Sequence, residues 1–184
     1  FVFAQARFND TTEYSKSRSN FLATTGIILG ALPFVTLIYG IIRNRYRYKI
    51  FRETVKLDNL PESLKGLKIV QISDIHSGSF DQIDPVKRAV ELINQEEAEL
   101  VVCTGDLVNS MAAEMTNYID VFSKIKAKSG VFSVLGNHDY GDYHNWSSVE
   151  EKKANLDTLK GIHRQMGWDL LLNENRILEL NNEK

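Results

Sequence analysis

"IVQISDIHSGSF", residues 69–80, reads as a strand that ends in two titratable side chains. Ile69, Val70 and Ile72 are β-branched residues, which are enriched in strands. Asp74 and His76 follow directly, although burying such polar groups is costly unless they have partners. This stretch therefore indicates a buried strand whose carboxyl end holds a site.

Short β-branched runs alternate with longer segments of helical periodicity along the rest of the chain. We expect strands over residues 67–73, 100–103, 131–135, 169–172 and 176–180, and helices over residues 84–95, 112–127 and 148–166. Strands that alternate with helices are typical of βαβ units. The sequence therefore predicts an α/β domain with a mostly parallel sheet.

A polar motif follows each of the first three expected strands. The motifs are DIH at 74–76, GDLVN at 105–109 and GNHD at 136–139. Asp74, Asp106 and Asn137 are spaced by 32 and 31 residues, about one βαβ unit each. Because ligands of open α/β sheets bind beyond the carboxyl ends of the strands, we expect the three motifs to meet at one edge.

The side chains in these motifs suit divalent metal ions. Aspartate and asparagine oxygens with histidine nitrogen are ligands for Mn, Fe, Zn or similar ions. Asp74 and His76 can face one ion only where the backbone turns, and residues 77–79 (SGS) supply a turn. Gly105 and Gly136 allow the backbone to approach closely beside the ligands. A carboxylate can also bridge two ions about 3.5–4 Å apart, an arrangement that serves phosphoryl transfer.

Each motif taken alone also fits a turn without a ligand. D-x-H pairs occur in loops by chance, and GNHD could be a turn that leads into a helix. Three such motifs in order, at strand ends and evenly spaced, favour a common metal site over three unrelated turns.

Together the motifs resemble the signature of the calcineurin-like metallophosphoesterase superfamily. The blocks VQISDIHSGS, VVCTGDLVNS and VFSVLGNHDYG look most like its bacterial membrane-associated branch. Some members of that branch cleave the pyrophosphate of UDP-2,3-diacylglucosamine. The resemblance covers about residues 55–180 and implies a metallophosphoesterase-type α/β sandwich.

The resemblance also implies two divalent metal ions as cofactors. Asp74 and His76 would bind the first metal, Asp106 would bridge both, and Asn137 would bind the second. A hydroxide activated by both metals would then attack phosphorus in line.

Catalytic roles are implied for the two residues after Asn137. His138 would lie over the phosphate, where it stabilises charge or protonates the leaving oxygen, and Asp139 occupies the family's acidic position. Asn109 stands where many relatives have an aspartate paired to the histidine. We expect it to support His138 by a hydrogen bond, although an amide cannot raise the imidazole pKa by charge.

The sequence departs from the family pattern on its C-terminal side. The family completes its metal ligands with a further histidine and a late G-H-x-H. Neither His144 nor His163 lies in such a motif. We therefore expect the N-terminal half of the domain, truncated at its C-terminal side and inactive on its own.

Residues 21–42 form an uncharged, apolar run of 22 residues, long enough to span a bilayer. Pro33 within it is tolerated in a membrane helix. A buried soluble helix is the alternative; a cleaved signal peptide fits less well, because RNRYRYK follows instead of small residues. We expect an N-terminal flanking segment at 1–20, a transmembrane helix at 21–42, a basic juxtamembrane linker at 43–54 and the metallophosphoesterase domain at 55–184.

Charge is distributed unevenly along the chain. Residues 1–53 carry eight Lys/Arg and three Asp/Glu, whereas residues 54–184 carry fourteen and twenty-one. Five basic residues follow the apolar run and three precede it, which favours a cytoplasmic domain. A general nucleic-acid binder needs a basic face, so we expect no nucleic-acid partner for the acidic domain.

The sequence thus favours a membrane-anchored, metal-dependent phosphoesterase. Its substrate would be a phosphodiester or pyrophosphate, and a lipid-linked one because an anchor keeps the site near the bilayer. Two alternatives stay open: a catalytically inactive membrane-bound binding or sensing module of the same fold, and an envelope-facing phosphodiesterase.

Overall fold

The chain divides into two units, one up to residue 50 and one from residue 51 onward. A computed structural model describes residues 15–41 and 46–180. Residues 1–14 of the expected flanking segment therefore lie outside the described residues. The same holds for residue 42 of the expected membrane helix and for residues 43–45 of the linker.

The first unit contains the helix α1, Lys16–Tyr39. Among the described residues it is the one helix long and apolar enough to cross a membrane. No residue of α1 is buried among the described residues. The Thr36 hydroxyl donates to the Pro33 carbonyl at 2.8 Å, so its polar side chain is satisfied within the helix.

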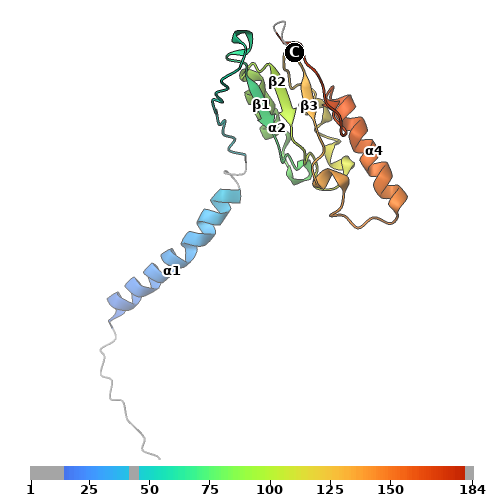
Figure 1. Cartoon of the computed structure of the whole chain (residues 1–184). Helices are drawn as coiled ribbons and strands as arrows, with labels where there is room; N and C mark the ends of the chain where they lie inside the picture. The colour runs from blue at the N-terminus through green and yellow to red at the C-terminus, as the bar shows by residue number, and fades with distance from the viewer. Residues whose placement is uncertain (1–14, 42–45, 181–184) are drawn as a thin grey trace, which may run out of the picture. The chain divides into compact units, whose positions relative to one another are not determined.

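The second unit is built on a four-stranded parallel sheet, in which the strands lie in chain order. Figure 1 labels the first three of them, side by side. The strands are β1 (Ile69–Ile72), β2 (Leu100–Cys103), β3 (Val131–Ser133) and β4 (Asp169–Leu170). Ile72 pairs with Cys103, and Cys103 pairs with Ser133, so three strands end in line. The prediction of an α/β fold with a mostly parallel sheet is confirmed.

The longest two helices of this unit are α2 (Ile83–Gln95) and α4 (Val149–Gln165). Their apolar side chains join the strands in one core cluster, with Val90 from α2, Leu159 from α4 and Val101 from β2. Both helices follow the expected boundaries within one residue. This packing fixes the strands, and hence the positions of their carboxyl ends.

The helix expected over residues 112–127 is wrong. The segment forms a short 3₁₀ helix, η4 (Ala112–Met115), and a single helical turn, α3 (Ile119–Phe122). Apolar residues recur there with helical spacing, but several backbone bonds run three residues back, as from Thr116 N to Ala113 O at 3.1 Å and from Tyr118 N to Met115 O at 2.8 Å. Such bonds close 3₁₀-type turns, which occur in short pieces and not as a long helix.

The strand expected over residues 176–180 is also wrong, apart from an isolated bridge at Leu180. Arg176 at its start pairs with Asp169 at 2.8 Å and with Glu174 at 2.7 Å. The pair with Asp169 places the start of the segment beside β4.

His163 on α4 is fully buried, and its Nδ1 lies 2.9 Å from the Ser133 hydroxyl. Burial lowers its pKa to about 4. The unfolded chain, with a histidine pKa near 6.5, therefore binds more protons than the folded chain between these values. Stability contributed by neutral His163 should fall as the pH drops from about 6.5 toward 4.

His163→Gln should remove this contribution. Both proteins should lose stability when the pH is lowered from about 7 to about 5. We expect the loss in the free energy of unfolding to be about 1–2 kcal/mol smaller in the variant than in the parent. Urea titration of the detergent-solubilised protein, followed by tryptophan fluorescence, measures the difference. Equal losses in both proteins would contradict the assignment.

Candidate metal centre

Three loops meet at the carboxyl edge of the sheet, each continuing from a strand. They are the first loop (residues 73–79, after β1), the second loop (residues 104–111, after β2) and the third loop (residues 134–139, after β3). Backbone bonds join the first to the second: Asp74 N donates to Gly105 O at 3.2 Å, and His76 N to Asp106 O at 3.0 Å. The pairing of β1 with β2 thus extends into the loops.

The backbone turns sharply at the expected ligands themselves. Asp74, His76 and Asp106 have φ values of 53°, 46° and 56°. Residues other than glycine seldom adopt this left-handed conformation, and such strain concentrates at functional sites. The turn expected at residues 77–79 is present as a 3₁₀ helix, η3 (Ser77–Ser79), but the change of direction begins at Asp74.

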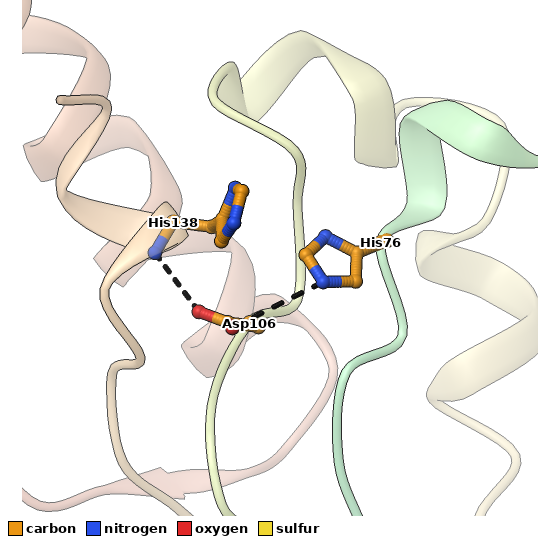
Figure 2. A group of neighbouring side chains, drawn as sticks. All are labelled: His76, Asp106 and His138. Atoms are coloured by element: carbon orange, nitrogen blue, oxygen red, sulfur yellow. Dashed lines mark hydrogen bonds and ion pairs between the residues drawn. The ribbon is translucent and has the colours of Figure 1, made fainter. Parts of the chain in front are cut away.

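Side chains from the three loops converge. Figure 2 shows His76, Asp106 and His138 directed toward one another, and each offers a ligand atom within 4.8 Å of the others. His76 Nε2 lies 4.0 Å from Asp106 Oδ2 and 3.9 Å from Asp74 Oδ1. The backbone N–H of His138 donates to Asp106 Oδ1 at 2.9 Å, which orients this carboxylate.

This donor set fits a divalent ion of the Mn, Fe or Zn type. Carboxylate oxygen and imidazole nitrogen bind such ions at about 2.0–2.2 Å, so two ligands of one ion lie at most roughly 4.4 Å apart. The separations of His76 from Asp74 and Asp106 meet that limit. His138 was expected in a catalytic role, and its position beside the two other side chains also allows it to bind an ion.

His138 is held from two sides. Its Nδ1 lies 2.8 Å from the backbone carbonyl of Asn109, which leaves Nε2 as the free ring nitrogen of the neutral form. The Asn109 side chain instead bonds to the Ser79 hydroxyl. Asn109 therefore supports His138 through its main chain, and the identity of its side chain is not what orients the imidazole.

Tyr143 covers the site from the segment after the third loop. Its ring stacks on His138 with centroids 4.4 Å apart and an interplanar angle of 27°. Its hydroxyl accepts a hydrogen bond from Asn137 Nδ2 at 3.0 Å. An amide that donates through its nitrogen keeps its oxygen free, which is the atom that a metal would use.

Asp139 lies behind the loops rather than among the converging side chains. It is fully buried, and its carboxylate accepts four backbone hydrogen bonds, from residues 106, 107, 108 and 136. Burial raises the pKa of the Asp139 carboxyl, and these four bonds oppose the rise. Asp139 thus binds backbone and does not belong to the converging group of His76, Asp106 and His138.

The remaining histidines lie elsewhere in the described residues. His163 is buried beside Ser133, and His144 packs edge-on against Trp146 with centroids 4.6 Å apart. Of the aromatic residues after the third loop, Tyr143 contacts His138 and Asn137. Sequence reasoning missed Glu114, whose carboxylate binds the second loop; its only sequence signal is an acidic residue three positions after Met111.

Comparisons with known proteins identify the family of the chain. The calcineurin-like phosphoesterase family model matches residues 67–183. A transmembrane protein with metallophosphoesterase domain from Danio rerio is 31% identical over 134 residues, which are 72% of this chain and 30% of that protein. An uncharacterized metallophosphoesterase from Helicobacter pylori strain J99 is 36% identical over 159 residues, 86% of this chain and 40% of that protein.

A relative with a named activity is also found. UDP-2,3-diacylglucosamine pyrophosphatase LpxG of Chlamydia muridarum is 31% identical over 114 residues, which are 61% of this chain and 35% of that protein. The chain thus spans between 30% and 40% of the length of these three relatives. The matched segment contains all three loops of the candidate metal centre, and the chain belongs to the calcineurin-like phosphoesterase family.

Proposed function

We propose that the full-length protein is a membrane-anchored, metal-dependent phosphoesterase that hydrolyses a phosphodiester or pyrophosphate. The observation that carries this proposal is the convergence of His76, Asp106 and His138 at the carboxyl edge of the sheet. The family supports phosphoester hydrolysis as the reaction class.

The chain's own residues would divide the work as follows. Asp74, His76, Asp106 and Asn137 would hold two divalent ions, with Asp106 between them. Two such ions, when bound, supply an activated water nucleophile and neutralise charge on the phosphoryl group.

His138 would act on the substrate's phosphate. Its bond to the Asn109 carbonyl fixes the ring with a proton on Nδ1, so that Nε2 would donate to a phosphate oxygen only when the ring is doubly protonated, as a general acid. Stacking on Tyr143 limits the ring's rotation. His138 would thereby stabilise the leaving oxygen without rearranging during the reaction.

A lipid-linked pyrophosphate similar to UDP-2,3-diacylglucosamine is the substrate that we propose. Two observations favour it: α1 is long and apolar enough to anchor the protein at a bilayer, and one relative is named for that pyrophosphatase activity. We propose a cytoplasmic position for the catalytic domain, from the excess of basic residues that follow the apolar run. A reporter fused behind the domain reads the side of the membrane directly.

The test uses full-length protein, stripped of metal by a chelator and assayed before and after Mn²⁺ is added. We expect hydrolysis of bis-p-nitrophenyl phosphate and of UDP-2,3-diacylglucosamine only with metal. The lipid-linked substrate should have the higher kcat/KM, since binding of its acyl chains contributes to transition-state stabilisation.

Three outcomes would contradict parts of the proposal. Hydrolysis that continues after treatment with the chelator would contradict the metal-dependent mechanism. Equal kcat/KM values for UDP-glucosamine and its diacylated form would contradict the proposal of a lipid-linked substrate. Tight Mn²⁺ binding without hydrolysis of any tested phosphoester would favour the inactive binding module.

A further inference from the structure

Two carboxylates bind the backbone of the second loop along most of its length. The loop forms no helix or strand, although Leu107 and Val108 in it are fully buried. Buried backbone N–H groups need acceptors. The six consecutive N–H groups of residues 106–111 all donate to carboxylate oxygens, and these belong to Asp139 and Glu114.

Asp139 binds the first half of the loop and joins it to the third loop. Its Oδ1 accepts from Leu107 N at 2.8 Å and from Val108 N at 3.2 Å. Its Oδ2 accepts from Asp106 N and from Gly136 N, both at 2.9 Å. One side chain thus fixes the positions of Asp106 and of the residue preceding Asn137.

Glu114 binds the second half of the loop and joins it to the first loop. Its Oε1 accepts from Ser110 N at 3.0 Å and from Met111 N at 2.9 Å. Its Oε2 accepts from Asn109 N at 2.6 Å and from Gly78 N at 3.1 Å. Glu114 thereby places the carbonyl of Asn109, which holds His138.

The two carboxylates are arranged alike. Each accepts four backbone bonds, two per oxygen, with three donors from the second loop and one from a neighbouring loop. Such charge-assisted bonds are about twice as strong as neutral ones, and four of them use the acceptor capacity of a carboxylate. Neither side chain belongs to the converging group of His76, Asp106 and His138.

We propose that Asp139 and Glu114 are positioning residues that hold the three loops in their metal-binding arrangement before a metal ion arrives. In the metal-free protein the carboxylates of Asp74 and Asp106 repel each other and would separate the loops. Bonds formed on folding oppose this repulsion, so metal binding does not have to order the loops. The proposal rests on the proposed function for the identity of the site as a metal centre.

Substitution of each carboxylate by its isosteric amide tests Asp139 and Glu114 separately. Glu114→Gln and Asp139→Asn each turn one acceptor oxygen into an NH₂ group that faces two N–H donors. Calorimetry on the full-length protein should give a Mn²⁺ dissociation constant about 10–100-fold larger for each variant, the usual cost of losing a group that orients ligands.

Hydrogen exchange in the metal-free protein supplies a readout that does not depend on activity. Glu114→Gln should accelerate exchange at residues 109–111 and 78, and Asp139→Asn at residues 106–108 and 136. A general loss of stability would instead accelerate exchange throughout the core.

Glu151→Gln is the matched control. Its carboxylate accepts the backbone N–H of Ser147 at 2.9 Å, and neither residue belongs to the three loops. We expect unchanged Mn²⁺ affinity and unchanged exchange at residues 106–111. If Asp139→Asn does not fold, the half-buried Glu114 carries the test alone.

Unchanged exchange or unchanged Mn²⁺ affinity in Glu114→Gln overturns the proposal, whatever the activity. The proposed function can fail independently. If the wild-type protein binds Mn²⁺ and loses affinity on Glu114→Gln, yet hydrolyses no phosphoester, then the positioning role stands and the proposed enzymatic activity is contradicted.

Discussion

Asp106→Asn in the full-length protein should lower kcat/KM for bis-p-nitrophenyl phosphate by at least ~10³-fold. Asp106 lies on the second loop between the first and the third, with its Oδ2 4.0 Å from His76 Nε2 and its Oδ1 bound to the His138 N–H. The amide keeps the size and the bond to His138 but removes the negative charge that would hold the ions. Metal ions supply several kcal/mol of transition-state stabilisation, and each 1.36 kcal/mol is tenfold in rate.

Metal analysis separates this effect from unfolding. The variant should retain the fluorescence and the urea midpoint of the parent while its bound metal falls. Asp84→Asn is the control, because Asp84 is exposed at the start of α2 and pairs only with Lys87 among the described ion pairs. Asp106→Asn protein with full metal content and more than about a tenth of the parent activity would reject the bridging role.

Gly105→Ala should destabilise the domain by about 3 kcal/mol or more, because its backbone touches the third loop. A Cβ at Gly105 would overlap the backbone nitrogen of Gly136, and neither atom can move without displacing the loops. The residue also has φ +104°, a conformation that costs a side chain about 1–3 kcal/mol.

Gly130→Ala is a control with almost the same backbone strain. Gly130 has φ +107°, but a Cβ there would meet only the Phe132 ring, at 3.5 Å. It should therefore lose the strain energy alone, about 1–3 kcal/mol. Urea unfolding of both variants, followed by tryptophan fluorescence, gives the difference, and equal losses would mean that the close contact of Gly105 with Gly136 is unimportant.

The sheet and its site edge could be predicted because they depend on local patterns. The β-branched run 100–103 is a strand with the expected boundaries, and the parallel sheet follows from alternation with helices. Gly105 and Gly136 were expected to allow close approach, and a Cβ at either would overlap the opposite loop. The helix over residues 112–127 failed because the backbone N–H groups of Thr116 and Tyr118 bond three residues back in 3₁₀-type turns, and apolar spacing does not distinguish such turns from an α-helix.

The partners of the site residues could not be predicted in the same way. Sequence spacing brings His76, Asp106 and His138 to one edge, but it does not say which polar group each side chain meets. Asn109 meets His138 through its carbonyl and not through its amide, and Tyr143 meets Asn137. These contacts depend on the path of the loops, which is set by bonds between residues about 30 positions apart.

By itself the sequence determined the family and the α/β fold, because these depend on residue types and on the period at which they recur along the chain. Only the tertiary structure decided what the acidic residues around the motifs do. Asp139, next to His138 in the "GNHD" motif, faces backbone N–H groups, as does Glu114. A carboxylate looks the same in sequence whether it faces a metal or a loop, and the folded backbone alone determines which one it meets.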